Sequence, residues 1–155
     1  MTLTISLRRL GYRVAHRGLR VYWLVARPQL SGVKCALLDG DSVLLVRHTY
    51  GPACWDLPGG KIRRGEPPGT AARREIREEL GIGVTAWTEI GEIQARTHHR
   101  RDTVHCFQAR VGTPPLTLDF GELEAARWFD AGRIPPDRGE LVDRIIALSD
   151  LERAT

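Results

Sequence analysis

The sequence predicts an α/β fold, in which helices cover a β-sheet, and three observations lead to this prediction. Two apolar, β-rich runs flank Asp39, Gly40 and Asp41, which is typical turn chemistry for a β-hairpin. Both runs are almost continuously apolar, so their sheet should be covered on both faces. Two later segments place their apolar residues on one helical face and supply the covering helices. A chain of 155 residues suits one domain with a real hydrophobic core.

The N-terminal third divides into a basic stretch and the hairpin. Residues 1–27 are rich in arginine and amphipathic, and they predict an extra helix that ends before Pro28. The hairpin strands are expected at residues 33–38 and 43–48. We therefore expect an N-terminal helix of residues 1–27 ahead of a folded domain of residues 28–155.

A glycine- and proline-rich passage follows, and after it comes a second helix. This helix should begin near Pro67 and Pro68 and end at Gly81, because proline suits the first helical turn and glycine the C-terminus. The passage reads TYGPACWDLPGGKIRRGEPPG and covers residues 49–69.

The last part of the chain predicts more strands and a closing helix. Strands are expected at residues 84–95 and 103–111, and a strand that runs into a turn at residues 125–136. Within residues 137–152, one helical face carries the apolar residues Leu141, Ile145 and Leu148. The order of elements therefore alternates strands with helices, as an α/β domain requires.

Composition limits the compartment and the partners. The three cysteines, Cys35, Cys54 and Cys106, lack metal-ligand spacing, so we expect reduced thiols in a cytoplasmic protein. A formal net charge of +4 suits polyanionic partners such as nucleotides, nucleic acid or anionic lipid, and it equally suits plain solubility. The N-terminus lacks the anatomy of a signal peptide, and the longest apolar run, residues 21–26, is too short to span a bilayer.

The stretch "RREIREELGI", residues 73–82, gathers carboxylates near the end of its helix. Glu75, Glu78 and Glu79 fall within an arc of roughly 100° at the edge of the expected buried face. Their mutual repulsion and the helix dipole both make this arrangement unfavourable. A divalent cation such as Mg²⁺ or Mn²⁺ would turn the repulsion into coordination. The alternative is a solvated helix whose arginines neutralise the glutamates.

Residues upstream of this helix complete a known pattern. Reading from Gly60, five residues lead to Glu66 and seven more lead to an uninterrupted run, residues 74–82 with the sequence REIREELGI. The pattern resembles the Nudix box, the loop–helix–loop signature of hydrolases that act on nucleoside diphosphates linked to another group. All nine specified positions are filled within 23 residues. A match of this length is very unlikely to arise by chance, in contrast to a match to a lone glycine motif.

The resemblance implies a fold, a metal site and a reaction. The implied fold is an α/β/α sandwich with a mixed β-sheet, to which the N-terminal helix is an addition. Glu75, Glu78, Glu79 and the backbone carbonyl of Gly59 are expected to hold Mg²⁺ or Mn²⁺. Glu66 and Arg74 of the box are expected to form a structural pair. The implied reaction is attack of an activated water on a phosphorus of a pyrophosphate linkage.

Catalysis also needs a general base and groups that bind the nucleotide. The family resemblance implies that the base is a glutamate shortly before an aromatic strand. Glu122 lies six residues before Trp128, and this spacing is closer to that of the family than the spacing of Glu124. Glu124 and a box glutamate such as Glu78 are the alternatives. Lys61 and Arg47 are expected to bind substrate phosphates, and His48 could do the same. Arg47 and His48 could equally be ordinary residues at the end of their strand. Trp55 could stack on a base, but an aromatic residue before a turn favours the core.

Other functions remain open at this point. The domain could be a nucleotide-binding or sensing module, although such modules usually lose box glutamates. The basic N-terminal stretch could bind nucleic acid or a membrane surface, or could pair two subunits into a homodimer. Residues beyond the box do not decide which nucleotide is the substrate.

Overall fold

The structure is a computed structural model that describes residues 30–97 and 100–151. The predicted N-terminal helix of residues 1–27 lies outside the described residues, and its roles in dimerisation or surface binding stay predictions. Neither of the two described α-helices is long and apolar enough to cross a bilayer.

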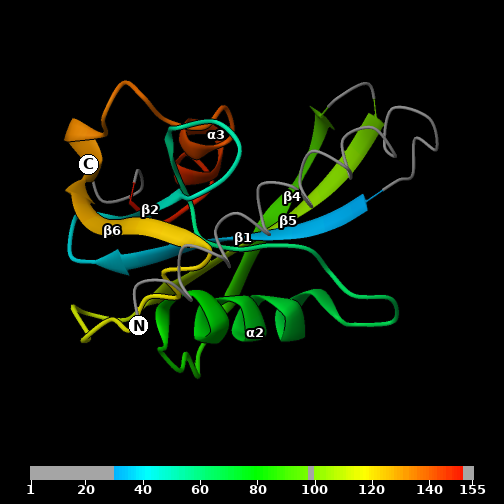
Figure 1. Ribbon diagram of the computed structural model, residues 1–155, viewed down its shortest axis with the longest axis horizontal. Helices are drawn as coiled ribbons and strands as arrows, with labels where there is room; N and C mark the ends of the chain where they lie inside the picture. The colour runs from blue at the N-terminus through cyan, green and yellow to red at the C-terminus, as the bar shows by residue number, and fades with distance from the viewer. Residues whose placement is uncertain (1–29, 98–99, 152–155) are drawn as a thin grey trace.

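A mixed β-sheet forms the centre of the domain (Figure 1). Its strands are β1 (Leu30–Asp39), β2 (Ser42–His48), β3 (Trp55–Asp56), β4 (Thr88–Thr97), β5 (Arg100–Arg110) and β6 (Leu123–Asp130). They follow the order β3-β2-β1-β5-β4, with β6 also paired to β2. The pair β1 and β5 is parallel and the other pairs are antiparallel, so the sheet is mixed as expected.

The predicted hairpin is confirmed as β1 and β2. Asp39 pairs with Ser42 and Leu38 with Val43, around the two-residue turn of Gly40 and Asp41. Gly40 has a φ of 54°, a left-handed conformation that glycine adopts at little cost.

Beyond the turn, the edge of β1 is occupied by the loop between β3 and α2, residues 57–67. The amide of Val33 donates to the carbonyl of Gly60 at 2.8 Å, and the amide of Cys35 donates to the carbonyl of Pro58 at 2.9 Å. A Cβ atom at Gly59 would lie 2.2 Å from the Val33 carbonyl oxygen, so only glycine allows this approach. The β3–α2 loop is thereby held on the sheet as if it were a further strand.

Helices cover the two faces of the sheet, which confirms the expected sandwich (Figure 1). Helix α2 (Pro68–Leu80) packs on one face and helix α3 (Val142–Ile146) on the other. Side chains of a strand point alternately to the two faces, so β1 sends Cys35 and Leu37 toward α2 and Ala36 and Leu38 toward α3. Both strands of the hairpin are therefore apolar on both sides.

Helix α2 begins and ends where the sequence predicts. Pro67 is its N-cap, with proline at the first helical position, and Gly81 ends it with a φ of 71°. The Gly81 amide donates to the carbonyl of Arg77 at 3.1 Å. A Cβ atom at Gly81 would lie 2.7 Å from Cβ of Thr117, so glycine also lets the following chain pass close by.

The closing helix is much shorter than the predicted segment of residues 137–152. Residues 137 and 139 are bonded to β3, since the Trp55 amide donates to the Asp137 carbonyl at 2.8 Å and the Gly139 amide to the Trp55 carbonyl at 2.7 Å. Beyond Ile146 the chain tightens into turns, and the Ser149 hydroxyl donates to the Ile146 carbonyl at 2.6 Å. These contacts restrict α3 to Val142–Ile146.

Two other predicted boundaries were also wrong by a few residues. Strand β4 begins at Thr88 instead of residue 84, because Val84 and Trp87 pack against the core beneath α2 instead of joining the ladder. Strand β5 begins at residue 100 and extends the hairpin with β4 beyond the predicted start at residue 103. The predicted strand and turn near residues 125–136 are present as β6 and the 3₁₀ turn η1 (Ala131–Arg133).

Candidate active site

Glu79 is the most buried charged side chain of the box helix. Only 2% of its surface is exposed, on the face of α2 that packs toward the sheet. Its Oε2 atom accepts a hydrogen bond of 3.0 Å from the backbone amide of Gly59. Glu79 and the β3–α2 loop are therefore linked directly, which places a carboxylate beside the glycines of the loop.

Glu75 lies one turn earlier on α2 and faces the same loop. A Cβ atom at Gly60 would lie 2.6 to 2.7 Å from the Glu75 carboxyl group, so the glycine leaves room for this carboxylate. Gly59 and Gly60 thus have different physical tasks, since the first allows contact with the sheet and the second allows contact with the helix.

Arg74 holds the box together through a dense set of hydrogen bonds. Its guanidinium donates to both oxygens of Glu66 at 2.8 Å, in the bidentate geometry typical of an arginine–carboxylate pair. It also donates to Glu75 at 2.7 Å, to Glu78 at 3.1 Å and to the carbonyl of Lys61 at 3.0 Å. The hydrogen bond from Arg74, together with the amide of Arg63, lowers the pKa of Glu66 to about 2. Glu66 and Arg74, the expected structural pair, thus join the loop to the helix.

The environment of Glu75 and Glu79 raises their proton affinity in the metal-free protein. Burial is the main cause that raises the pKa of Glu79 to about 8, and the carboxylates of Glu75 and Glu122 contribute in the same direction. Burial also raises the pKa of Glu75, although the Arg74 guanidinium opposes the shift. A positive charge placed between these groups would therefore be strongly stabilised.

Glu122 joins this group from a distant part of the sequence. The chain after α2 is bonded back to the helix end, because the amide of Thr117 donates to the Leu80 carbonyl at 2.8 Å and the amide of Asp119 to the Glu79 carbonyl at 3.0 Å. The carbonyl of Glu122 in turn accepts from the amide of Thr49 at 2.8 Å. These anchors bring Glu122 to the box, whereas Glu124 is exposed on β6.

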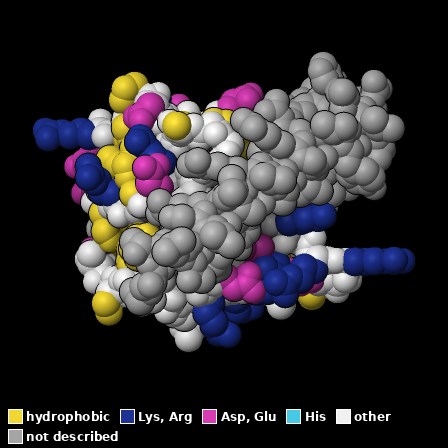
Figure 2. All heavy atoms as spheres, viewed as in Figure 1, with side chains coloured by type: hydrophobic (Ala, Val, Ile, Leu, Met, Phe, Trp, Pro, Cys, Tyr) yellow, Lys and Arg dark blue, Asp and Glu magenta, His cyan; other side chains and the backbone are white. Residues whose placement is uncertain are grey.

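These groups line one open cleft, called here the box cleft. It has a volume of about 500 Å³ and is lined by Tyr50, Gly59, Gly60, Lys61, Ile62, Arg63, Arg64, Arg74, Glu75, Glu78, Glu79 and Glu122. The expected metal-site glutamates, Lys61 and the preferred candidate base therefore share one cavity, but Glu124 is not part of its lining. Figure 2 shows basic side chains around acidic ones over α2 and the adjoining loop.

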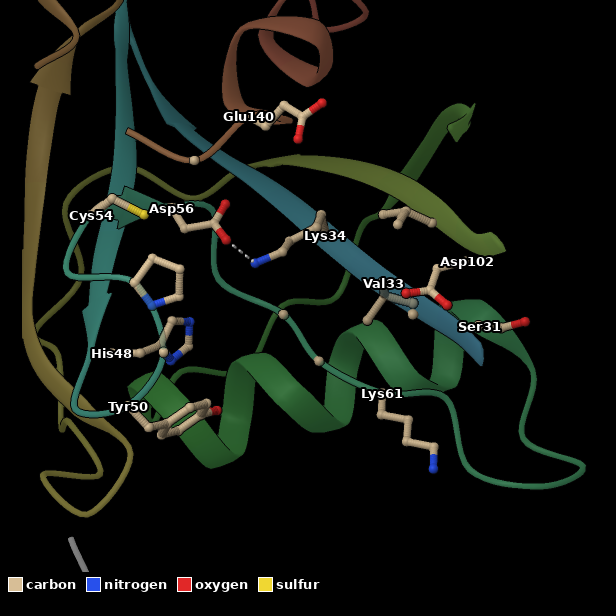
Figure 3. A pocket seen from close by; sticks show the side chains of 17 residues that line it. Ser31, Val33, Lys34, His48, Tyr50, Cys54, Asp56, Lys61, Asp102 and Glu140 are labelled. Carbon is tan, nitrogen blue, oxygen red and sulfur yellow. Dashed lines mark hydrogen bonds and ion pairs between the residues drawn. The ribbon is translucent and has the colours of Figure 1, made fainter. Parts of the chain in front are cut away.

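A second cleft, called here the Lys34 cleft, meets the box cleft at Tyr50, Gly59, Gly60 and Lys61. Its volume is about 490 Å³, and Figure 3 shows side chains that line it. Lys34 of β1 donates to Asp56 at 2.8 Å and to the carbonyl of Leu57 at 2.7 Å. Burial acts to lower the pKa of Lys34, but the Asp56 carboxylate, together with Glu79 and Cys35, outweighs it and the pKa is raised. Lys34 and Asp56 were not found from the sequence, because no local motif links residues 22 positions apart.

His48 at the end of β2 forms another part of this cleft, beside Tyr50 (Figure 3). The two rings lie 5.3 Å apart between centroids. Burial, followed by the charge of Lys34, lowers the pKa of His48 to about 4. The imidazole is therefore neutral near pH 7 and is not a cationic phosphate ligand.

Arg47 and Trp55 contact each other on the face of the sheet that α3 covers. Trp55 is 8% exposed and belongs to the core, as favoured from the sequence. The Arg47 guanidinium lies 4.8 Å from the Trp55 ring centroid and forms an ion pair with Asp137. Arg47 lines neither of the two clefts, so its expected contact with a substrate phosphate has no support from this geometry and stays a prediction.

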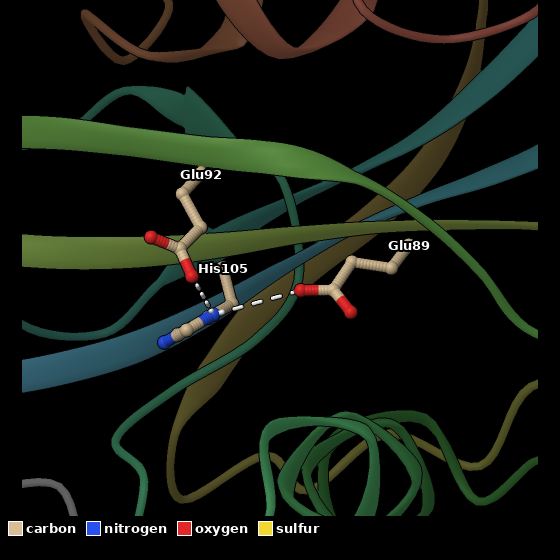
Figure 4. A group of neighbouring side chains, drawn as sticks. All are labelled: Glu89, Glu92 and His105. Atoms are coloured by element: carbon tan, nitrogen blue, oxygen red, sulfur yellow. Dashed lines mark ion pairs between the residues drawn. The ribbon is translucent and has the colours of Figure 1, made fainter.

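A separate acidic group lies on the β4–β5 hairpin (Figure 4). Nδ1 of His105 lies 3.1 Å from a carboxylate oxygen of Glu92 and 3.7 Å from one of Glu89. Both glutamates are exposed, and Glu92 is the direct cross-strand neighbour of His105. Contacts of this kind are common between polar side chains of neighbouring strands, and we assign no ion to the group.

Comparison with known proteins places the chain beside hydrolases of nucleotide derivatives. The family model for the NUDIX domain matches residues 28–148. The ADP-ribose pyrophosphatase of Mycobacterium tuberculosis is 30% identical over 120 residues, which cover 71% of this chain and 58% of that protein. The nucleoside triphosphatase NudI of Escherichia coli is 35% identical over 77 residues, which cover 43% of this chain and 54% of that protein. The match therefore spans little more than half the length of these two relatives.

Similarity to solved structures agrees with the sequence matches. A MutT NUDIX hydrolase from Burkholderia pseudomallei superposes with a TM-score of 0.72 at 25% identity, covering 83% of this chain and 99% of that one. The agreement extends over nearly the whole of that chain, so the two chains share this fold.

Proposed function

The chain belongs to the Nudix family, and from this premise we propose that it hydrolyses a pyrophosphate linkage in a nucleoside di- or triphosphate derivative, with the help of a divalent cation. The observation that carries the proposal is the box cleft, in which Glu75, Glu78, Glu79 and Glu122 line one cavity with Lys61. Local stability does not account for Glu75 and Glu79 there, because burial and repulsion from neighbouring carboxylates both oppose their charges.

The donor set of the box cleft fits a hard divalent cation. Glu75 and Glu79, with Glu78 beside them and the carbonyl of Gly59, would hold Mg²⁺ or Mn²⁺ through oxygen atoms. Nudix hydrolases generally need such an ion. When bound, the ion lowers the pKa of water and neutralises charge on phosphate oxygens.

The chain's own groups would orient the reactants and move a proton. The water oxygen forms a bond to phosphorus while the anhydride P–O bond breaks, and the departing oxygen keeps the electron pair. We assign Glu122 as the base that accepts the water proton, because it is the non-helical carboxylate of the cleft. Lys61 is exposed at the cleft and would bind a phosphate, while Arg74 holds Glu75 and Glu78 in place.

Cation binding should depend on pH through Glu79. The pKa of this carboxyl is about 8 without metal, so at lower pH a cation must displace its proton. We expect the apparent affinity for Mg²⁺ to rise about 10-fold per pH unit from pH 6 toward pH 8 and then to level off. Titration calorimetry in buffers with different ionisation enthalpies would measure both the affinity and the released proton. Equal affinities at pH 6 and pH 8, without proton release, would show that Glu79 is not a ligand.

The reaction itself is tested with a panel of nucleotides. Nucleoside triphosphates, diphosphate sugars, dinucleoside polyphosphates and dinucleotides are incubated with Mg²⁺ or with Mn²⁺, and the products are separated. We expect cation-dependent cleavage at a pyrophosphate linkage, and the products identify the attacked phosphorus. An intact panel with both cations would remove the hydrolase assignment.

The alternative of a nucleotide-sensing module has less support. The specified box positions are filled, and the box carboxylates line a cavity, which a module that only binds nucleotides would not need. The three free thiols fit the reducing cytoplasm that we propose as the location. Binding of nucleic acid or of a membrane surface would depend on residues 1–27.

A further inference from the structure

The β3–α2 loop runs antiparallel to β1 along the edge of that strand. Gly32 of the strand pairs with Lys61 of the loop. Three backbone hydrogen bonds of 2.8 to 3.0 Å join the two segments, and they pair Val33 with Gly60, Cys35 with Pro58 and Ser31 with Ile62. In this register Lys34 lies opposite Gly59, and a Cβ atom at Gly59 would lie 3.1 Å from the Lys34 Cα atom.

The Lys34 side chain adds a further tie between β1 and the loop, at the point where the loop begins. Its ammonium group donates to Asp56 at 2.8 Å, as Figure 3 shows, and to the carbonyl of Leu57 at 2.7 Å. The other oxygen of the Asp56 carboxylate accepts from the Leu57 amide at 2.8 Å. The Lys34 side chain is 17% exposed and that of Asp56 is 26% exposed. Water therefore competes only weakly for these hydrogen bonds.

The segment that these contacts hold presents its backbone to the proposed cation site. The amide of Gly59 donates to Glu79 at 3.0 Å, and the carbonyl of Gly59 is one of the proposed ligands. Gly59 has a φ of 141°, a conformation that glycine adopts at little cost. Glycine has no side chain that could fix its backbone by packing. The position of Gly59 therefore depends on the contacts of its neighbours, from Asp56 to Gly60.

These contacts give Lys34 a role in the site without contact to the reacting atoms. Resting on the hydrolase function proposed above, we propose that Lys34 is a positioning residue of the cation site. Through Asp56 and Leu57 it holds the β3–α2 loop on β1, and it thereby holds the Gly59 backbone where it meets Glu79. Residues that orient metal ligands in this way commonly change metal affinity or activity by about 10- to 100-fold.

The sign of the effect on cation binding distinguishes positioning from charge. Lys34 and Glu79 attract each other as opposite charges. Removing the Lys34 charge alone would strengthen the binding of a cation, because like charges repel. Lys34→Met removes the charge and the donors but keeps an unbranched apolar side chain. We expect this variant to bind Mn²⁺ about 10-fold more weakly than the wild type, in titration calorimetry without nucleotide. An unchanged or higher affinity would overturn the proposal.

Two further variants control for charge. Lys34→Met leaves the Asp56 carboxylate without this partner, which can weaken the fold, so the double variant Lys34→Met/Asp56→Asn removes both charges. It should bind Mn²⁺ as weakly as Lys34→Met. Lys61→Met removes the charge of an exposed lysine of the same loop and should bind Mn²⁺ at least as tightly as the wild type. Recovery of affinity in the double variant, or an equal loss in Lys61→Met, would overturn the proposal.

Amide hydrogen exchange in the metal-free proteins tests the same contact without a cation. Lys34→Met should speed exchange of the Gly59 and Cys35 amides about 10-fold, because local opening of the loop becomes easier. The amide of Val111 donates to the carbonyl of Leu38 at 3.0 Å, near the other end of β1, and should keep its wild-type rate. Equal acceleration of all three amides, or unchanged rates at Gly59 and Cys35, would overturn the proposal.

The outcomes separate this inference from the proposed function. With a nucleotide that the panel identifies, Lys34→Met should lower kcat about 10-fold and change KM by less than about 2-fold. A loss confined to KM, with wild-type affinity for Mn²⁺, would show that Lys34 contacts the nucleotide. That result would overturn the inference and leave the hydrolase function intact. If the wild-type protein hydrolyses nothing, the proposed function fails, and Mn²⁺ affinity and amide exchange still decide whether Lys34 holds the loop. If it also binds no Mn²⁺, amide exchange alone decides.

Discussion

Replacing Glu79 with glutamine should lower kcat on the order of 10³-fold, because it removes a charged ligand of the proposed cation while keeping the shape of the side chain. A catalytic cation contributes several kcal/mol to transition-state stabilisation, and each 1.36 kcal/mol is about tenfold in rate. The loss should persist at saturating Mg²⁺. Steady-state kinetics on the substrate found in the nucleotide panel would measure it.

The same substitution should stabilise the metal-free protein at pH 8. The pKa of Glu79 is about 8 in the folded protein and 4.5 for the ordinary side chain, so folding favours the protonated form. Stability is therefore unaffected below pH 4.5 and falls as pH rises between these values. Glutamine carries no charge, so the variant should gain a few kcal/mol in free energy of unfolding at pH 8, measured by urea unfolding with a chelator present.

Glu124→Gln serves as the control for Glu79→Gln, because Glu124 is exposed and outside the box cleft. It should leave both turnover and stability near the wild-type values. If Glu79→Gln kept near wild-type turnover at saturating Mg²⁺, the assignment of Glu79 to the cation would be wrong. A loss of stability in the variant at pH 8 would contradict the conclusion that its charge is unfavourable in the fold.

Glu122→Gln should lower kcat on the order of 10²-fold or more, as expected for loss of a general base. The amide cannot accept the proton of the attacking water, yet it preserves the side-chain volume. The fold should be unaffected, because in residues 30–97 and 100–151 the loop is anchored by the backbone of Glu122. Kinetics across pH and thermal unfolding would measure the two effects.

Glu124→Gln again provides the comparison, since it removes the same charge two residues away. It should retain wild-type kcat, which would assign the base to the carboxylate within the cleft. A change confined to KM in Glu122→Gln would show that Glu122 contributes to binding instead. Equal losses in both variants would indicate a general electrostatic effect of the loop.

Local sequence was sufficient for most elements of the fold. The hairpin of β1 and β2 follows from Gly40 and Asp41 between two apolar runs, and α2 follows from Pro68 and Gly81 at its ends. These features depend on φ angles and on side-chain periodicity, which nearby residues control. Helix α3 was overestimated because Asp137 and Gly139 bond to β3, a contact between distant segments that has no local signal.

For the site, the sequence by itself determined the box, because its groups lie on one helix and the loop that precedes it. The spacing of Glu75, Glu78 and Glu79 along one helix already places them on one side, and the family resemblance identified their partners Glu66 and Arg74. The box was therefore enough to predict family membership, and the match of the NUDIX family model over residues 28–148 confirms it.

Only the tertiary structure decided what surrounds the box. The return of the chain along the end of α2 brings Glu122 into the cleft and leaves Glu124 outside it. The pairing of Lys34 with Asp56 and the burial of His48 make the neighbouring cleft poor in net positive charge. Charge compensation and burial depend on which distant segments come into contact. The spacing of residues along the chain does not show these contacts.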